Sequence, residues 1–101
     1  MLLIKDMADM IIRRHLIISG LVQGVGFRWR AGQAARAAGV TGWVRNDRCG
    51  TVSMELQGSR EQIEQVLGTL ARAPWICMEE INTREIPTEP DEYGFVTRDD
   101  G

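Results

Sequence analysis

The stretch Ile18-Ser-Gly-Leu-Val-Gln-Gly-Val-Gly-Phe-Arg28 joins a β-branched run to an alanine-rich segment through three glycines. This order of residues predicts a strand, a glycine-rich loop and the start of a helix. Glycine allows backbone N–H groups to turn inward, and a helix N-terminus carries partial positive charge. A loop of this kind favours the binding of an anion.

Arg28 stands at the junction of the loop and the predicted helix. Its guanidinium group can donate two parallel hydrogen bonds to phosphate oxygens. The loop is neither a Walker A loop, because no Gly-Lys-Ser/Thr follows it, nor a GxGxxG dinucleotide loop. We expect its backbone amides to cradle a phosphoryl group, and the residues concerned are Gln23, Gly24, Val25, Gly26 and Phe27.

The remaining elements follow from hydrophobic periodicity on either side of this loop. Strands are predicted over residues 12–21, 40–47, 51–57, 76–86 and 93–98, and helices over 27–38 and 58–72. Gly39 suits the end of the first helix, and Ser59 with Gln62 forms a capping-box pattern for the second. The mixed pattern of 76–86 suggests a bulge, and residues 99–101 read as a frayed tail.

The order β-α-β-β-α-β with a short C-terminal strand predicts the α+β class. We expect a ferredoxin-like two-layer sandwich, in which two helices cover one face of a mostly antiparallel sheet. The strand at 12–21 is expected to be central, because it has apolar residues on both faces. Residues 12–101 would form this domain. Residues 1–11 lack a clear period, so they are either an N-terminal extension or part of the first strand.

The composition limits the classes of partner. A chain of 101 residues with 44% hydrophobic residues fits one domain, and a net charge of −2 provides no overall field for nucleic acid or an acidic membrane. No apolar run approaches a membrane span, and the N-terminus lacks the features of a signal peptide. We therefore expect a cytoplasmic protein that binds its anionic ligand locally, through Arg28, Arg30, Arg45 and Arg48. We also expect a monomer.

Two motifs resemble the acylphosphatase family. Residues 20–28 match the signature Gly-x-Val-Gln-Gly-Val-x-Phe-Arg, and residues 42–46 match Gly-Trp-Val-x-Asn, with Gly50 in the turn that follows. The resemblance covers roughly residues 14–98. Leu21 departs from the pattern, since the family usually has a basic residue there. The resemblance implies hydrolysis of acyl phosphates, with Arg28 and Asn46 at the two catalytic positions.

The chemistry of the residues agrees with that division of labour. The carboxylate leaving group of an acyl phosphate needs no general acid, so a phosphate cradle, a positive charge and a positioned water suffice. An amide is too weak a base to deprotonate water, so Asn46 would only orient it. Strand parity supports this role, since Asn46 shares a face with Val44. The alternative is that Asn46 merely begins the turn at Asp47.

Two functions remain open. The first is a metal-independent hydrolase without a cofactor, for which inorganic phosphate would be both product and competitive inhibitor. The second is a non-catalytic module that binds phosphate or carbamoyl phosphate, as acylphosphatase-like domains do within larger maturation proteins. Turnover of benzoyl phosphate would separate the two. No cluster of His, Cys or carboxylate residues in the sequence has metal-ligand spacing.

We expect no catalytic or nucleic-acid-binding role for His15, Trp29 or Trp43. His15, the only histidine, is expected to face solvent on the sheet rather than act as a base. Trp29 and Trp43 are expected to pack or to cover the sheet surface rather than to stack on RNA bases.

The cysteines and the acidic pairs are interpreted in the same way. Cys49 and Cys77 are expected to be free thiols, because they have neither CxxC spacing nor a histidine nearby in the sequence. The acidic pairs at 79–80 and 99–100 are expected to be solvated.

Overall fold

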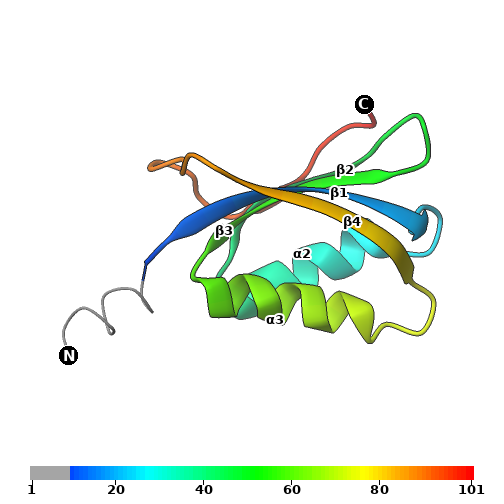
Figure 1. Cartoon of the computed structure of the whole chain (residues 1–101), viewed down its shortest axis with the longest axis horizontal. Coiled ribbons are helices and arrows are strands. Elements are labelled where there is room, and N and C mark those ends of the chain that lie inside the picture. Colours follow the sequence, from blue (N-terminus) through cyan, green and yellow to red (C-terminus); the bar gives the residue numbers. More distant parts are fainter. Residues whose placement is uncertain (1–9) are drawn as a thin grey trace.

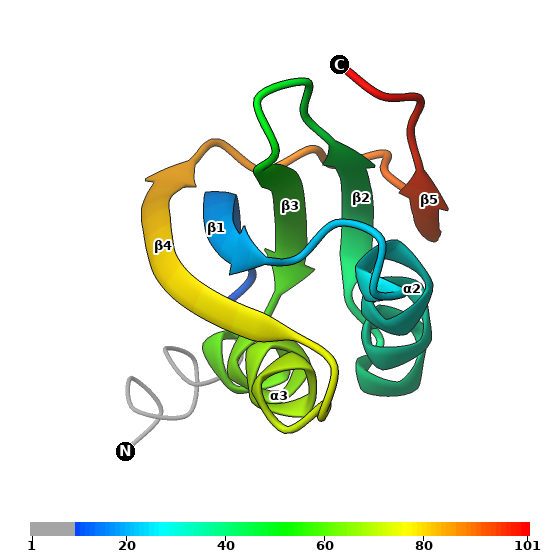
Figure 2. The same cartoon turned by 90° about the vertical axis from the view of Figure 1, so that its right-hand side faces the viewer.

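The computed structural model describes residues 10–101, which fold into two layers. The elements of this part are β1 (Ile12–Leu21), α2 (Phe27–Ala38), β2 (Thr41–Asn46), β3 (Val52–Gly58), α3 (Arg60–Ala71), β4 (Cys77–Ile86) and β5 (Phe95–Thr97). The strands form one sheet in the order β4-β1-β3-β2-β5, and both helices pack against one face of it (Figures 1 and 2). The predicted ferredoxin-like sandwich is confirmed.

Residues 1–9 of the expected N-terminal extension lie outside the described residues. Within residues 10–101, neither helix has the length and apolar character needed to cross a membrane.

Strand β1 is central, as predicted. It pairs antiparallel with β3 on one side and β4 on the other, whereas β2 and β5 pair in parallel. Opposite β1, Ser19 pairs with Glu80 but Gly20 pairs with Met78, so Glu79 is the extra residue of a β-bulge. The bulge predicted for residues 76–86 is therefore confirmed in β4 (Cys77–Ile86).

Alternating residues of the sheet and one stripe of each helix form the core. The side chains of Leu16, Ile18 and Met54 are fully buried beneath the helices. Helix α2 presents small residues to the sheet, among them Ala31 and Ala35 with no exposed surface, which allows a close approach. This packing fixes the start of α2 beside the end of β1.

Both helices end as their sequences indicate. Ser59 caps α3, because its Oγ accepts from the Gln62 amide at 3.2 Å while Gln62 Oε1 accepts from the Ser59 amide at 2.9 Å. Helix α2 ends at Gly39, which has φ of 76°. The capping box and the glycine cap are thus confirmed.

The C-terminal segment differs from the prediction. Tyr93 is 95% exposed and lies outside the last strand, which begins at Phe95. The expected frayed tail instead continues along β2, where the Gly101 amide donates to the Asn46 carbonyl at 2.9 Å and the Gly101 carbonyl accepts from the Arg48 amide at 2.7 Å. Backbone pairing with β2 orders this tail, and local sequence carries no sign of such a partner.

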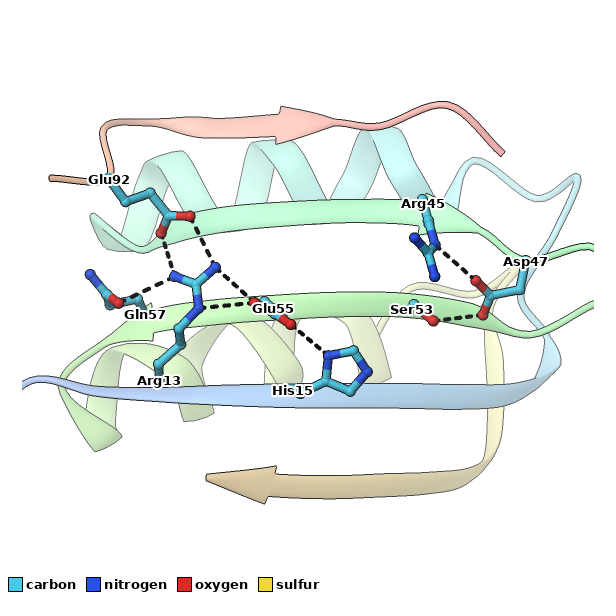
Figure 3. Close-up of polar contacts among 8 residues, drawn as sticks. All are labelled: Arg13, His15, Arg45, Asp47, Ser53, Glu55, Gln57 and Glu92. Carbon is cyan, nitrogen blue, oxygen red and sulfur yellow. Dashed lines mark hydrogen bonds and ion pairs between the residues drawn. The ribbon is translucent and has the colours of Figure 1, made fainter. Parts of the chain in front are cut away.

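The face of the sheet that carries no helix also differs from the prediction (Figure 3). Apolar and polar residues alternate in β3, which predicts that one face of the sheet is exposed to solvent. Arg13 of the neighbouring β1 lies on that face, yet it is only 2% exposed. Its guanidinium contacts Glu92 at 2.7 Å and Glu55 at 2.9 Å. His15, expected to face solvent, is 19% exposed, and its Nδ1 lies 2.7 Å from Glu55. The loop carrying Glu92 folds over this face and closes an ion-pair network.

The network shifts the titration of its members. Burial raises the pKa of Glu55, but hydrogen bonds from His15 and Arg13 outweigh it, so the pKa lies below its ordinary value. Burial likewise raises the pKa of Glu92, but hydrogen bonds outweigh it, chiefly the one from Arg13. The pKa of Glu92 therefore also lies below its ordinary value. Burial lowers the pKa of Arg13, but hydrogen bonds to Glu92 and Glu55 outweigh it, so this pKa lies above its ordinary value.

These shifts predict a loss of stability in acid. A carboxylate whose folded pKa is lowered stabilises the protein above its ordinary pKa, here 4.5 for Glu, and this contribution disappears as pH falls through the folded pKa. Glu92→Gln should lower the free energy of unfolding by about 2 kcal/mol at pH 7. The difference from the wild type should shrink below pH 4.5, where Glu92 also becomes protonated.

Urea unfolding between pH 3 and pH 7 would measure this effect. Glu64→Gln, which changes an exposed carboxylate of α3, is the matched control and should unfold like the wild type at each pH. A destabilisation by Glu92→Gln that stays constant across this range would contradict the ionic interpretation.

Candidate active site

The loop between β1 and α2, the turn between β2 and β3, and the C-terminal tail lie at the same end of the sheet (Figures 1 and 2). A cavity of about 430 Å³ opens there. It is lined by Val22, Gly24, Gly26, Phe27, Arg28, Trp29, Asn46 and Thr97. The structure thus brings Arg28 and Asn46, which come from different elements, together with the glycine-rich loop.

Buried side chains at both ends pin the loop. Val22 is 1% exposed and Phe27 is 2% exposed, while Val25 packs against the core from between them. Gly24 and Gly26 have φ of 75° and 78°, and no atom from beyond the adjacent residues lies within 4 Å of where a Cβ would be. Glycine is needed here for the left-handed backbone rather than for space.

The loop leads directly into the positive end of α2. Gly26 is the N-cap residue and provides no side-chain cap, and the first turn of the helix contains no acidic residue. The partial positive charge of the helix end is therefore not offset by its own first turn. This is the electrostatic setting that an anion requires.

Arg28 lies in the first turn of α2, and its side chain is 40% exposed. Its Nη1 is 3.2 Å from Oδ1 of Asp100 in the C-terminal tail. Asp100, predicted to be merely solvated, thus places a carboxylate oxygen against the guanidinium. An anionic oxygen can reach Arg28 at the rim of the cavity.

Asn46 is the last residue of β2 and stands opposite Val52 of β3. It shares the helix-side face with Val44, which is fully buried, as the strand parity predicts. The turn that follows is closed by its neighbour, because the Gly50 amide donates to the Asp47 carbonyl at 3.1 Å. The Asn46 side chain itself lines the cavity.

Gln23 ties the loop to the segment that carries Asn46. Its Nε2 donates to the carbonyl oxygens of Asp47 at 2.7 Å and Thr51 at 2.8 Å, the two ends of the β2–β3 turn. The sequence predicts a role for the backbone amide of Gln23 but not this role for its side chain. A polar residue between the buried Val22 and the half-buried Val25 is the signal that could have indicated it.

Asp47 organises the same turn. Its carboxylate accepts from Ser53 at 2.7 Å and from Arg45 Nε at 3.2 Å (Figure 3). It also accepts from the Thr51 hydroxyl at 2.7 Å. Burial raises the pKa of Asp47, but these hydrogen bonds, that from Ser53 foremost, outweigh it and hold the pKa below its ordinary value. The end of β2 that bears Asn46 is therefore fixed both by the hydrogen bonds of Gln23 and by those of Asp47.

The other expected arginines are placed elsewhere. Arg45 bonds to Asp47 and lies 5.4 Å from the centre of the Trp43 ring. Neither it, Arg30 nor Arg48 lines the cavity in the described part of the chain. Of the four arginines singled out from the sequence, Arg28 alone is at this site.

Trp43 and Trp29 differ in their exposure to solvent. Trp43 is 5% exposed on the helix-free face, beneath Arg98, so the packing role predicted for it is confirmed. Trp29 is 66% exposed at the cavity, so the same prediction is wrong for Trp29. Cys49 and Cys77 are exposed free thiols, as predicted.

A second cavity of about 540 Å³ lies on the helix-free face and suits phosphate less well. Four carboxylates line it, those of Glu55, Glu89, Asp91 and Glu92, and two of them already pair with its Arg13. Such a surface repels a phosphate dianion. Among residues 10–101, no group of three His, Cys, Asp or Glu residues is arranged to hold a metal ion.

Comparison with known proteins agrees with the geometry. Residues 14–97 match the family model described as acylphosphatase. An acylphosphatase of Bifidobacterium longum is 41% identical over 78 residues, covering 76% of this chain and 80% of the relative. An acylphosphatase of Acidiphilium cryptum is 40% identical over 91 residues, covering 89% of this chain and 99% of the relative.

Solved structures with the same fold include an isolated protein and part of a larger one. An acylphosphatase from Coxiella burnetii superimposes with a TM-score of 0.78 at 31% identity, covering 87% of this chain and 93% of the other. Full-length HypF, in its phosphate- and nucleotide-bound form, gives a TM-score of 0.80 at 26% identity, with 91% of this chain matched to 12% of HypF.

Proposed function

The chain belongs to the acylphosphatase family, and from this premise we propose that Arg28 and the glycine-rich loop hold the phosphate of an acyl phosphate while Asn46 orients the attacking water. Family membership makes the chain a hydrolase of acyl phosphates. The residue roles are our proposal. The observation that supports them is that Arg28, Asn46 and the loop residues Gly24, Gly26 and Phe27 line one cavity.

The reaction needs little beyond positioning and charge. The water oxygen attacks phosphorus, the bond from phosphorus to the acyl oxygen breaks, and its electron pair leaves with the carboxylate. A carboxylate is a weak base, so no general acid is required. A phosphate oxygen of the substrate accepts the proton of the water, because the Asn46 amide is not basic enough to do so.

Arg28 and the start of α2 supply the electrostatic part. The charge on the phosphoryl oxygens redistributes on the way to the transition state, and fixed positive groups stabilise it. The tie from Gln23 to the β2–β3 turn keeps the loop and Asn46 at a fixed separation. The phosphoryl group and the attacking water are therefore held in a fixed relative position and orientation.

The similarity to HypF supports a second candidate function, which is phosphate binding without catalysis. A module that only binds phosphate or carbamoyl phosphate would use the same loop without turnover, and HypF contains a region of this fold within a much longer chain. The high coverage of the Acidiphilium cryptum acylphosphatase favours the hydrolase. The monomeric state and the cytoplasmic location stay predictions from the sequence.

Benzoyl phosphate, followed by its ultraviolet absorbance, tests the proposal. We expect turnover that persists in excess chelator and that inorganic phosphate inhibits competitively. An alkyl phosphate should react far more slowly, because its alkoxide leaving group needs protonation. Binding of phosphate without turnover would favour the module. Activity that is lost in chelator and restored by a divalent ion would overturn the metal-independent mechanism.

A further inference from the structure

Trp29 is a large apolar side chain that the fold itself does not use. It lies in the first turn of α2 beside Arg28, and it is 66% exposed. The two other apolar side chains that line the cavity, Val22 and Phe27, are at most 2% exposed and belong to the core. Trp29 therefore supplies the exposed apolar surface of the candidate active site.

The position of the acyl group follows from the proposed function, on which this inference rests. With the phosphoryl group in the loop and against Arg28, the acyl group extends out of the loop from the bridging oxygen. In-line displacement places it on the side of phosphorus opposite the attacking water, and so away from Asn46. Once the loop glycines, Arg28 and Asn46 are assigned, Trp29 and Thr97 are the exposed lining residues left to meet it.

We propose that Trp29 is a specificity-determining residue that packs against the acyl group and favours aryl acyl phosphates over small ones such as acetyl phosphate. An indole face offers a flat apolar contact to an aromatic ring, and aromatic pairs gain beyond simple area burial. The methyl group of acetyl phosphate is too small to cover the ring. The selectivity arises at the leaving group and leaves the phosphate cradle common to all substrates.

The rival role for Trp29 lies on its other side. There it borders a hollow of about 370 Å³ between α2 and α3, which is also lined by Ala34, Ala37 and Gln65. If Trp29 served only that groove, its removal would leave the preference among acyl groups unchanged. The ratio of rates on two substrates therefore discriminates between the two roles.

The experiment measures kcat/KM for benzoyl phosphate and for acetyl phosphate. In Trp29→Ala, the benzoyl-to-acetyl ratio should fall by roughly threefold to tenfold, the range that an aromatic contact provides. Trp29→Phe, which keeps a ring, should retain most of the ratio. Alanine is a good helix former, so α2 should persist, and circular dichroism checks this.

Trp75→Ala is the matched control, because Trp75 is 67% exposed and lines none of the cavities described above. It should leave the ratio unchanged. An unchanged ratio in Trp29→Ala, or an equal fall in Trp75→Ala, overturns the inference while leaving the proposed function standing. A wild-type protein that turns over neither substrate overturns both.

Discussion

Arg28→Gln is expected to lower kcat/KM for benzoyl phosphate by about a thousandfold and to weaken competitive inhibition by inorganic phosphate. Glutamine keeps a polar side chain of moderate length but removes the charge and the fork of donors. A thousandfold corresponds to about 4 kcal/mol of transition-state stabilisation, which is reasonable for a charged group acting beside a helix N-terminus. Both effects arise because Arg28 contacts the phosphoryl group before and during the reaction.

The contact between Arg28 and Asp100 provides the matched control for that variant. Asp100→Asn removes the carboxylate that lies 3.2 Å from the guanidinium but leaves Arg28 in place. Because the pair is exposed, its loss should tighten phosphate inhibition by no more than about fivefold. Steady-state kinetics at fixed low ionic strength measures both variants. If Arg28→Gln keeps its phosphate affinity, Arg28 does not bind the phosphoryl group.

Asn46→Ala is expected to lower kcat by on the order of a hundredfold while the phosphate inhibition constant stays nearly unchanged. The water that Asn46 orients is not part of the bound phosphate, so its loss affects chiefly the transition state. Asn46 ends β2, and its backbone carbonyl accepts from the Gly101 amide, a hydrogen bond that does not involve the side chain. The fold should therefore be retained, which circular dichroism can verify.

The contrast between the two variants separates their roles. Loss of phosphate inhibition in Asn46→Ala as severe as in Arg28→Gln would place Asn46 in the cradle or in the fold. Full kcat would show that another group positions the water. Asn46→Asp is a useful companion, because it keeps the shape of the side chain but adds a negative charge beside the phosphate. It should weaken phosphate inhibition, whereas Asn46→Ala should not.

Much of the site could be predicted from the sequence because its parts are local. The loop glycines Gly24 and Gly26, the helix that follows and the end of a strand at Asn46 are each predicted from neighbouring residues. Strand parity placed Asn46 on the face of Val44, and the structure has it there. Capping at Ser59 and Gly39 is likewise a property of a few adjacent residues.

The missed features depend on residues that are distant in the sequence. Arg13 is buried because Glu92, 79 positions away, folds over it, and Gln23 reaches carbonyls 24 and 28 positions away. No periodic pattern connects such pairs. The exposure of Trp29 differs from the prediction for the same reason, since only the packed structure shows which face of a helix borders a cavity.

The sequence alone determined the order of the elements, the glycine-rich loop, the family resemblance and the candidate residues Arg28 and Asn46. Short-range sterics, hydrophobic periodicity and capping decide such features within a few residues. Tertiary structure decided that Asp100 meets Arg28, that Gln23 ties the loop to the β2–β3 turn, and that polar groups close over the helix-free face. These contacts form only when packing of the core brings distant segments together, because in an unfolded chain the entropic cost of closing such loops prevents them.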